Sequence, residues 1–180
     1  MPSYLLDLIP WFDPARGWRE RDGGPLELDM ATGELSGIPP RAPWDRLERF
    51  GRPANRAPRF YGSFDHPASG AVFRVDGTEV SAAELHLAAL GPDDDLTGLT
   101  RHADFRPAQL TIRLRDGQRF APTAETTPEQ VRAALGPAEE GIDVDWLSLN
   151  YPSETWELEF EFAPGGGPLA VIYVVYYRPD

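Results

Sequence analysis

The stretch LNYPSETWELEFEF, Leu149 to Phe162, decides how this chain folds. Its second half alternates large apolar side chains with glutamates, which is typical of a β-strand with one buried and one wet face. The proline and the polar residues before this strand mark a turn, so the stretch indicates a strand, a turn and a second strand. The predicted buried positions are Trp156, Leu158, Phe160 and Phe162, and the wet ones are Glu157, Glu159 and Glu161.

A second stretch, FDHPASGAVFRVDG from Phe64 to Gly77, shows the same order of strand, proline turn and strand. The two stretches align at an offset of 85 residues (43 to 128), which also superimposes the residues that begin and end two short helices. The aligned pairs are Pro43 with Pro128, Gly51 with Gly136, Ser63 with Ser148, His66 with Tyr151 and Pro67 with Pro152. Two upstream hairpins align at an offset of 84 (26 to 110). Matching elements and turn residues predict an internal duplication.

Each predicted repeat holds a hairpin, a short helix and three strands. The first helix is expected over 43–51, and the second begins with a capping box at Thr127 and ends at Gly136. The last strand, within 168–177, is apolar on both faces and is therefore expected at the centre of a sheet or under a cover. The segment 79–90 fits either a helix or a strand, and its alignment with the second repeat favours the strand.

We therefore expect an α+β fold in one domain, 1–180, built from two tandem repeats at about 26–90 and 110–177. An N-terminal extension, 1–25, and a connector, 91–109, complete the chain. Two sheets that join edge to edge or face to face bury strand edges that would otherwise promote aggregation.

The helix endings LGP and FGRP, each followed by a meander, resemble the repeat of the β-lactamase-inhibitor-protein-like superfamily, which also includes small outer-membrane assembly lipoproteins. The resemblance covers about 26–90 and 110–177. It implies a tandem repeat whose helices pack on one face of the sheet or sheets, and whose other, concave face binds a partner protein together with protruding turns. Those relatives carry disulfides or a lipidated cysteine, and this chain has no cysteine, so the resemblance implies no contact residues.

The net charge of −12 narrows the range of partners. A surface of this sign repels phosphate backbones and speeds the approach of basic proteins, although it also serves solubility alone. We expect no nucleic-acid binding and a basic protein as the partner. The apolar runs are too short to cross a membrane, and the first residues do not resemble a secretory signal. The lack of cysteine favours a cytoplasmic location.

The three histidines are expected to be structural. His66 follows Asp65, but its aligned counterpart is Tyr151, so the position is expected to hold an aromatic ring beside a turn. His86 is expected as a polar strand residue, and His102 as a solvated residue of the connector. No serine lies in the pattern of a nucleophile elbow. We therefore expect no catalytic residues.

The carboxylates indicate no metal or cofactor site either. The three glutamates of the quoted strand are expected to form a charge ladder with Arg113 and Arg115 on a wet face. The acidic loops at 93–95 and 139–145 lack the spacing of a calcium loop, and whether they bind a cation stays open. We expect no cofactor and no metal ligands.

Aromatic residues gather in the second half of the chain and are the candidates for partner binding. Tyr and Trp are favoured at interfaces because they combine a large apolar area with a polar group. Strand alternation sends some of them into the core and sends adjacent Tyr176 and Tyr177 to opposite faces. The candidates are Trp146, Tyr151, Trp156, Tyr173, Tyr176 and Tyr177.

These features predict a non-enzymatic protein-binding module, such as an immunity protein or inhibitor that captures a basic partner. The alternatives are a structural or assembly factor and a small hydrolase with an acidic pocket. A buried cluster of unpaired carboxylates, or His66 in a deep pocket, would contradict the binding module. An open concave face with Trp and Tyr beside acidic loops would contradict the enzyme.

Overall fold

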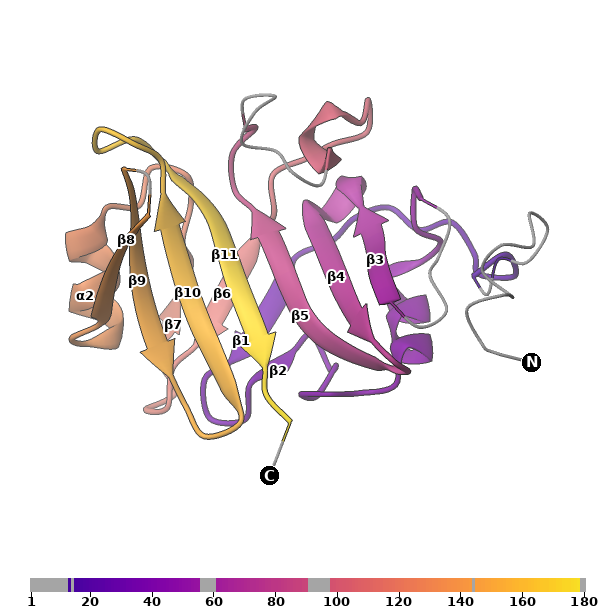
Figure 1. Cartoon of the computed structure of the whole chain (residues 1–180), viewed down its shortest axis with the longest axis horizontal. Helices are drawn as coiled ribbons and strands as arrows, with labels where there is room; N and C mark the ends of the chain where they lie inside the picture. The colour runs from indigo at the N-terminus through magenta and orange to yellow at the C-terminus, as the bar shows by residue number, and fades with distance from the viewer. Residues whose placement is uncertain (1–12, 14, 56–60, 91–97, 144, 179–180) are drawn as a thin grey trace.

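The computed structural model describes residues 13, 15–55, 61–90, 98–143 and 145–178. One group of strands comprises β3 (Tyr61–His66), β4 (Ala71–Asp76), β5 (Glu79–His86), β8 (Glu139–Asp143), β9 (Trp146–Pro152), β10 (Trp156–Phe162) and β11 (Leu169–Tyr176). They form a large sheet in the order β3-β4-β5-β11-β10-β9-β8. A second group comprises β1 (Leu26–Asp29), β2 (Glu34–Leu35), β6 (Leu110–Arg113) and β7 (Arg119–Phe120). They form a small sheet, β2-β1-β6-β7, which lies behind the large one (Figure 1).

The expected α+β fold with helices packed on one face of the sheet is wrong, because the described chain is mostly β-sheet. The α-helix α2 (Pro128–Leu135) is short, and η1 (Trp44–Phe50), η2 (Pro67–Ser69) and η3 (Leu99–Arg101) are 3₁₀ turns. The two upstream hairpins pair with each other and make the small sheet, which covers the inner face of the large one. The helices α2 and η1 lie toward opposite ends of the large sheet (Figure 1).

The strands β1 and β6 pair in parallel at the centre of the small sheet. Leu26 lies opposite Leu110 and Leu28 lies opposite Ile112, and all four side chains are buried. These are the residues that the sequence alignment matches at the offset of 84. The pairs β1–β2 and β6–β7 are antiparallel, which confirms both predicted hairpins. The duplication itself stays a prediction.

The strands β3 to β5 and β8 to β11 form two meanders that meet where β5 pairs with β11. The segment 79–90, which fits either a helix or a strand in the sequence, is a strand over Glu79–His86. The expected central position of the last strand is confirmed, because Val171 and Ile172 on its two faces are both at most 1% exposed. The edge strand β8 falls within 139–145, where the sequence predicts a loop.

The two helical segments differ because only one of them has a capping side chain. The hydroxyl of Thr127 accepts a hydrogen bond from the backbone N of Gln130 at 3.4 Å, and Oε1 of Gln130 accepts one from the backbone N of Thr127 at 2.8 Å. The predicted capping box is therefore confirmed. Pro43 offers no side-chain cap, and the segment predicted as a helix over 43–51 is a 3₁₀ turn over Trp44–Phe50.

The core lies between the two sheets. All four apolar residues of β10 are buried, as its alternation predicts. Phe64 and Phe73 lie opposite each other on β3 and β4, and the rings of Trp18 and Trp44 each lie 5.7 Å from that of Phe64. Complete burial of one such side chain contributes about 2–3 kcal/mol. The inner face of the large sheet is thus the main source of stability.

We expect Phe160→Ala to lower the free energy of unfolding by about 3–5 kcal/mol, because a fully buried aromatic side chain leaves a cavity when it is removed. Denaturant titration followed by tryptophan fluorescence measures the change. Ile142→Ala is the matched control, since this β8 side chain is 81% exposed and its removal should cost less than about 0.5 kcal/mol. Similar losses of unfolding free energy in both variants would contradict the placement of Phe160 in the core.

Candidate functional site

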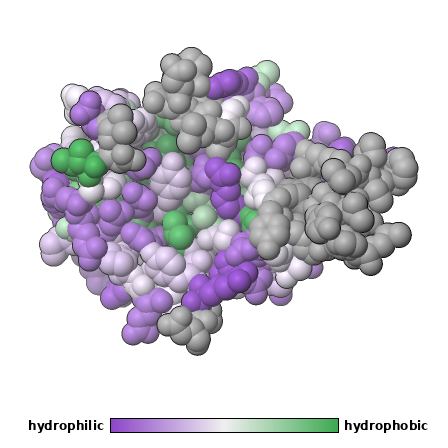
Figure 2. All heavy atoms as spheres, in the orientation of Figure 1, coloured by the Kyte–Doolittle hydropathy of each residue, from purple (hydrophilic) through white to green (hydrophobic). Residues whose placement is uncertain are grey.

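The outer face of the large sheet, which points away from the small sheet, is the first candidate surface. Figure 2 views this face and shows mostly hydrophilic residues around a few hydrophobic ones near its middle. Alternate residues of each strand contribute to it. Strand pairing sets Glu84, Tyr173, Glu159 and Asn150 in one row across β5, β11, β10 and β9.

The six aromatic candidates divide equally between the two sides of the sheet. The inner three, Tyr151, Trp156 and Tyr176, are buried in the core. Trp146, Tyr173 and Tyr177 occupy outer-face positions. Tyr177 is 38% exposed and the other two are half-buried. The expectation that Tyr176 and Tyr177 face opposite sides is confirmed, and half of the set remains available to a partner.

Three glutamates, Glu157, Glu159 and Glu161, follow one another along the outer side of β10, and we call them the glutamate stripe. The hydroxyl of Tyr177 donates a hydrogen bond to Oε2 of Glu157. Burial of Glu159, together with the charge of Glu157, raises the pKa of Glu159 above its usual value. Within the described part of the chain, no arginine forms an ion pair with Glu157 or Glu159.

The expected charge ladder between the glutamate stripe and Arg113 and Arg115 is wrong. Arg113 lies on β6 in the other sheet, where its guanidinium binds Asp29 and lies 3.8 Å from Glu27. Arg115 follows β6 and lines a cavity beside α2. Sequence order does not reveal which sheet a strand joins, so it could not separate these arginines from the stripe.

Tyr173 lies in the middle of the acidic part of the outer face. Burial raises its pKa most, and the charges of Glu161, Glu84 and Glu159 raise it further. Glu84 differs from the stripe because it binds Arg74 of β4. Sequence reasoning missed Glu84, since its place on this face depends on the pairing of β5 with β11. Three carboxylates thus surround one tyrosine.

Toward β3 the outer face is buried, and part of the connector lies against it. The backbone N of Ala108 donates to the carbonyl of His86 at 2.8 Å. His86 is buried on β5, and its Nε2 lies 3.9 Å from Oε2 of Glu84. Burial raises the pKa of Asp65, and a hydrogen bond with the side chain of Ser63 offsets part of this rise. His102 is exposed, as expected.

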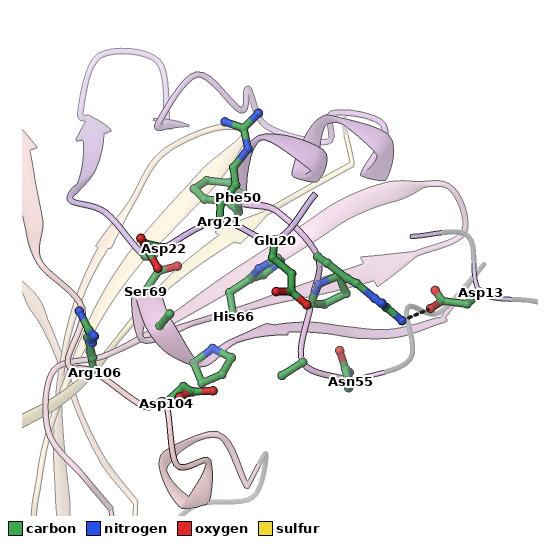
Figure 3. Close-up of a pocket in the computed structure, with 16 residues that line it drawn as sticks. Asp13, Glu20, Arg21, Asp22, Phe50, Asn55, His66, Ser69, Asp104 and Arg106 are labelled. Carbon is green, nitrogen blue, oxygen red and sulfur yellow. Dashed lines mark ion pairs between the residues drawn. The ribbon is translucent and has the colours of Figure 1, made fainter. Parts of the chain in front are cut away.

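A cavity of about 750 Å³ opens where β3 ends and η2 begins. His66 lines it and is only 4% exposed, and its ring lies 5.9 Å from that of Phe50 and 5.7 Å from that of Phe73. Burial lowers the pKa of His66 to about 4, so the ring is neutral at neutral pH. Its Nε2 has no hydrogen-bond partner within the described chain. Figure 3 shows the walls, which come from 20–23, 50–55, 66–69 and 104–106 together with Asp13.

The aligned residue Tyr151 has a partner that His66 lacks. Its hydroxyl donates to the carbonyl of Gly136, which ends α2, at 3.2 Å. Tyr151 also lines a second cavity, of about 620 Å³, together with Leu135, the aligned counterpart of Phe50. His66 is buried beside the turn as expected, but the hydrogen bond of its counterpart is missing. In the sequence, the signal for this difference is that the aligned positions hold a histidine and a tyrosine.

The described residues hold neither a metal cluster nor a membrane-spanning helix. No group of three or more His, Cys, Asp or Glu among them is arranged to hold a metal ion. No helix in the same part of the chain is long and apolar enough to cross a membrane. The acidic run at 93–95 lies outside the described residues.

Comparisons with known proteins do not place the chain in a family. No protein-family model and no curated protein matches the sequence. Among solved structures, the chain is similar to YjgB, a DUF4309 family protein from Bacillus subtilis, at 16% identity and a TM-score of 0.41. The similarity covers 74% of this chain and 76% of that one, and a score this low supports no argument about fold or function. The resemblance to the β-lactamase-inhibitor-protein-like superfamily stays a prediction.

The pKa of His66 predicts how stability changes with pH. Between pH 6.5 and about 4 the unfolded chain binds a proton at this ring that the folded chain does not, so stability falls as the pH falls through that range. A shift of this size corresponds to about 3 kcal/mol. We expect His66→Phe to gain stability relative to the natural protein as the pH is lowered. Urea unfolding of both proteins at neutral pH and near pH 4 measures the difference, and a pH-independent difference would refute the assignment.

Proposed function

We propose that this protein is a non-enzymatic binding module that captures a basic partner protein on the outer face of β9, β10 and β11. The observation that carries the proposal is the glutamate stripe of β10, which lies among outward aromatic residues and apart from the arginines of the small sheet. Repulsion between neighbouring carboxylates is relieved when a partner places cations between them. The stripe therefore favours lysine- or arginine-rich ligands.

Charge complementarity operates both at contact and at long range. At contact, the raised pKa of Glu159 reflects burial and the adjacent charge of Glu157, and a guanidinium placed between these side chains would oppose both effects. At long range, the net charge of −12 attracts a basic protein and speeds its approach. Binding of this kind weakens as salt concentration increases.

The outward aromatic residues add contact area next to the charges. Tyr177 holds Glu157 through its hydroxyl and exposes part of its ring, so a cation on Glu157 would also lie close to a π face. Tyr173 of β11 lies directly opposite Glu159, and Trp146 lies at the start of β9, one residue before its pairing with β10 begins. Aromatic residues next to charged ones are typical of the residues that dominate binding energy at interfaces.

An immunity protein or inhibitor of a basic toxin or enzyme, located in the cytoplasm, is the specific role that we propose. An assembly factor would use the same surface and differ only in the outcome of binding. His66 does lie in a pocket, as the hydrolase alternative would require. However, a ring with a pKa of about 4 is a weak general base at neutral pH, and we therefore favour binding.

The glutamate stripe is tested with two double variants of equal charge. Glu157→Gln with Glu159→Gln neutralises the stripe, and Glu48→Gln with Glu125→Gln removes the same charge from exposed positions elsewhere. We expect the stripe variant to weaken binding about tenfold or more, equivalent to about 1.4 kcal/mol, and the control variant to leave it nearly unchanged. The partner is isolated from lysate of the native organism on immobilised natural protein, and its affinity for each purified variant is measured by calorimetry at low and high salt.

A partner that binds both double variants equally well would contradict the proposal, even if it is basic. An equal loss of affinity in both double variants would indicate that the partner responds to the net charge of the protein and not to this face. Only a partner that the stripe variant loses, and that high salt releases from the natural protein, supports the outer face as the binding surface.

Tyr177→Ala should weaken binding of the same partner several-fold while changing the free energy of unfolding by less than about 1 kcal/mol, because the ring is partly exposed. Tyr176→Phe is the neighbouring control, since its hydroxyl is buried and has no hydrogen-bond partner in the described chain. We expect this control to bind as the natural protein does. Affinity and thermal unfolding are measured for both variants. Unchanged affinity in Tyr177→Ala would remove the aromatic part of the proposal.

A further inference from the structure

The large sheet ends at β3 on one side and at β8 on the other, and the two edges differ (Figure 1). At β3, the side chain of Asn55 donates to the carbonyl of Ser63 at 2.9 Å and accepts from the backbone N of Asp65 at 3.0 Å. At β8, no hydrogen bond joins the backbone to any described group outside β9. Alternate residues of an edge strand turn their N–H and C=O groups away from the sheet. These groups of β8 are therefore open to another strand.

The edge strands of the small sheet are too short to hold a further strand. Both β2 and β7 span two residues, whereas β8 spans five. Very short edge strands are one of the ways in which native sheets avoid pairing with other chains. Among the strands that the structure describes, β8 thus combines an open edge with enough length to pair.

The inner side of β8 offers an apolar contact. Ile142 and Tyr177 are the exposed large apolar residues of the described chain, and Ile142 is much the more exposed, at 81% against 38%. Ile142 lies opposite Leu147 of β9, which packs against the core. Glu140, which shares this side of β8, already binds Arg132 of α2 at 2.6 Å. An added strand would therefore cover Ile142 without burying an unpaired charge beside it.

The outer side of the same strand is acidic. Glu139 lies opposite Asn150 of β9, which in turn lies opposite Glu159 of the glutamate stripe. Glu139 is exposed and forms no ion pair with a residue that the structure describes. Opposite charges on neighbouring strands stabilise their pairing. Because side chains alternate along a strand, a segment in which apolar and basic residues alternate fits both sides of β8 at once.

A second copy of this chain fits the edge poorly. If two β8 strands paired antiparallel about Gly141, Glu139 would lie opposite Asp143 of the second copy. Like charges in this position destabilise strand pairing, and each chain carries a net charge of −12. The same charges attract a basic segment. The edge therefore discriminates by charge against its own copy and in favour of a basic strand.

We propose that the free edge of β8 binds an extended segment of another protein as an additional strand, in which apolar residues alternate with lysine or arginine. The apolar residues of this segment contact Ile142, its basic residues face Glu139, and the open backbone groups of β8 form the hydrogen bonds. The edge uses none of the residues of the glutamate stripe. It therefore stands whether or not the outer face of β9, β10 and β11 binds a basic protein.

The test uses the full chain and a fluorescent peptide with blocked ends, KVRVKVR, whose affinity is measured by anisotropy at physiological salt. Two further peptides carry N-methyl groups either on all valines or on all basic residues, and each blocks the N–H groups of one edge of the peptide strand. A strand added to β8 uses only one of its own edges. We expect one methylated peptide to bind like the parent and the other to bind about tenfold or more weakly. Amide hydrogen exchange in β8 should slow about tenfold or more when the parent peptide is bound.

Two variants separate the edge from the outer face. Ile142→Thr removes the apolar contact but keeps a β-branched side chain, and it should weaken binding of the parent peptide about threefold or more with an unchanged circular dichroism spectrum. Glu157→Gln with Glu159→Gln alters the glutamate stripe and should weaken this peptide less than Ile142→Thr does. The reverse order would place the peptide on the outer face and overturn the edge site.

Three other results would also overturn the proposal. The first is failure of KVRVKVR to bind, or to slow exchange in β8. The second is equal binding of the two methylated peptides, or binding of the acidic peptide EVEVEVE as strong as that of KVRVKVR. The third is a dimer of the natural protein, seen by analytical ultracentrifugation, that Ile142→Thr dissociates, since a second copy would then occupy the edge.

Discussion

The antiparallel pairing of β5 with β11 is the contact on which the rest of the architecture depends. It joins the two meanders into one large sheet and sets Leu85 opposite Ile172 and Glu84 opposite Tyr173. Because side chains alternate along a strand, a slip of β5 by one residue would turn Leu85 outward and Glu84 toward the core. One register therefore determines both the core and the acidic outer face.

Local alternation made the second half of the chain easy to predict. The inner and outer residues of β10, the central place of β11 and the capping box of α2 all depend on neighbours within a few positions, and each is confirmed. The edge strand β8 was missed because Glu139 and Glu140 begin it without apolar alternation. Edge strands bury little and therefore leave a weak pattern in the sequence.

Long-range partners were the part of the fold that the sequence did not reveal. The hairpin of β6 and β7 pairs with the first hairpin and not with the strands that follow it, and this pairing puts a second sheet where a helical layer was expected. The same pairing places Arg113 in the small sheet, where it binds Asp29 and not the glutamate stripe. At the candidate sites, alternation separates Tyr176 from Tyr177, but only the surroundings of His66 show that its nitrogen lacks a partner.

The distance along the chain between paired strands also affects folding during synthesis. The strand β1 can pair only after β6 has been synthesised, because Leu26 lies opposite Leu110. In the same way, β5 can pair with β11 only after Ile172, which lies opposite Leu85, has been added. Contacts this far apart in sequence slow folding, because long loops must close before any contact is gained. Until β11 leaves the ribosome, β5 carries a bare edge beside an incomplete core. A bare edge of this kind favours association between unfinished chains.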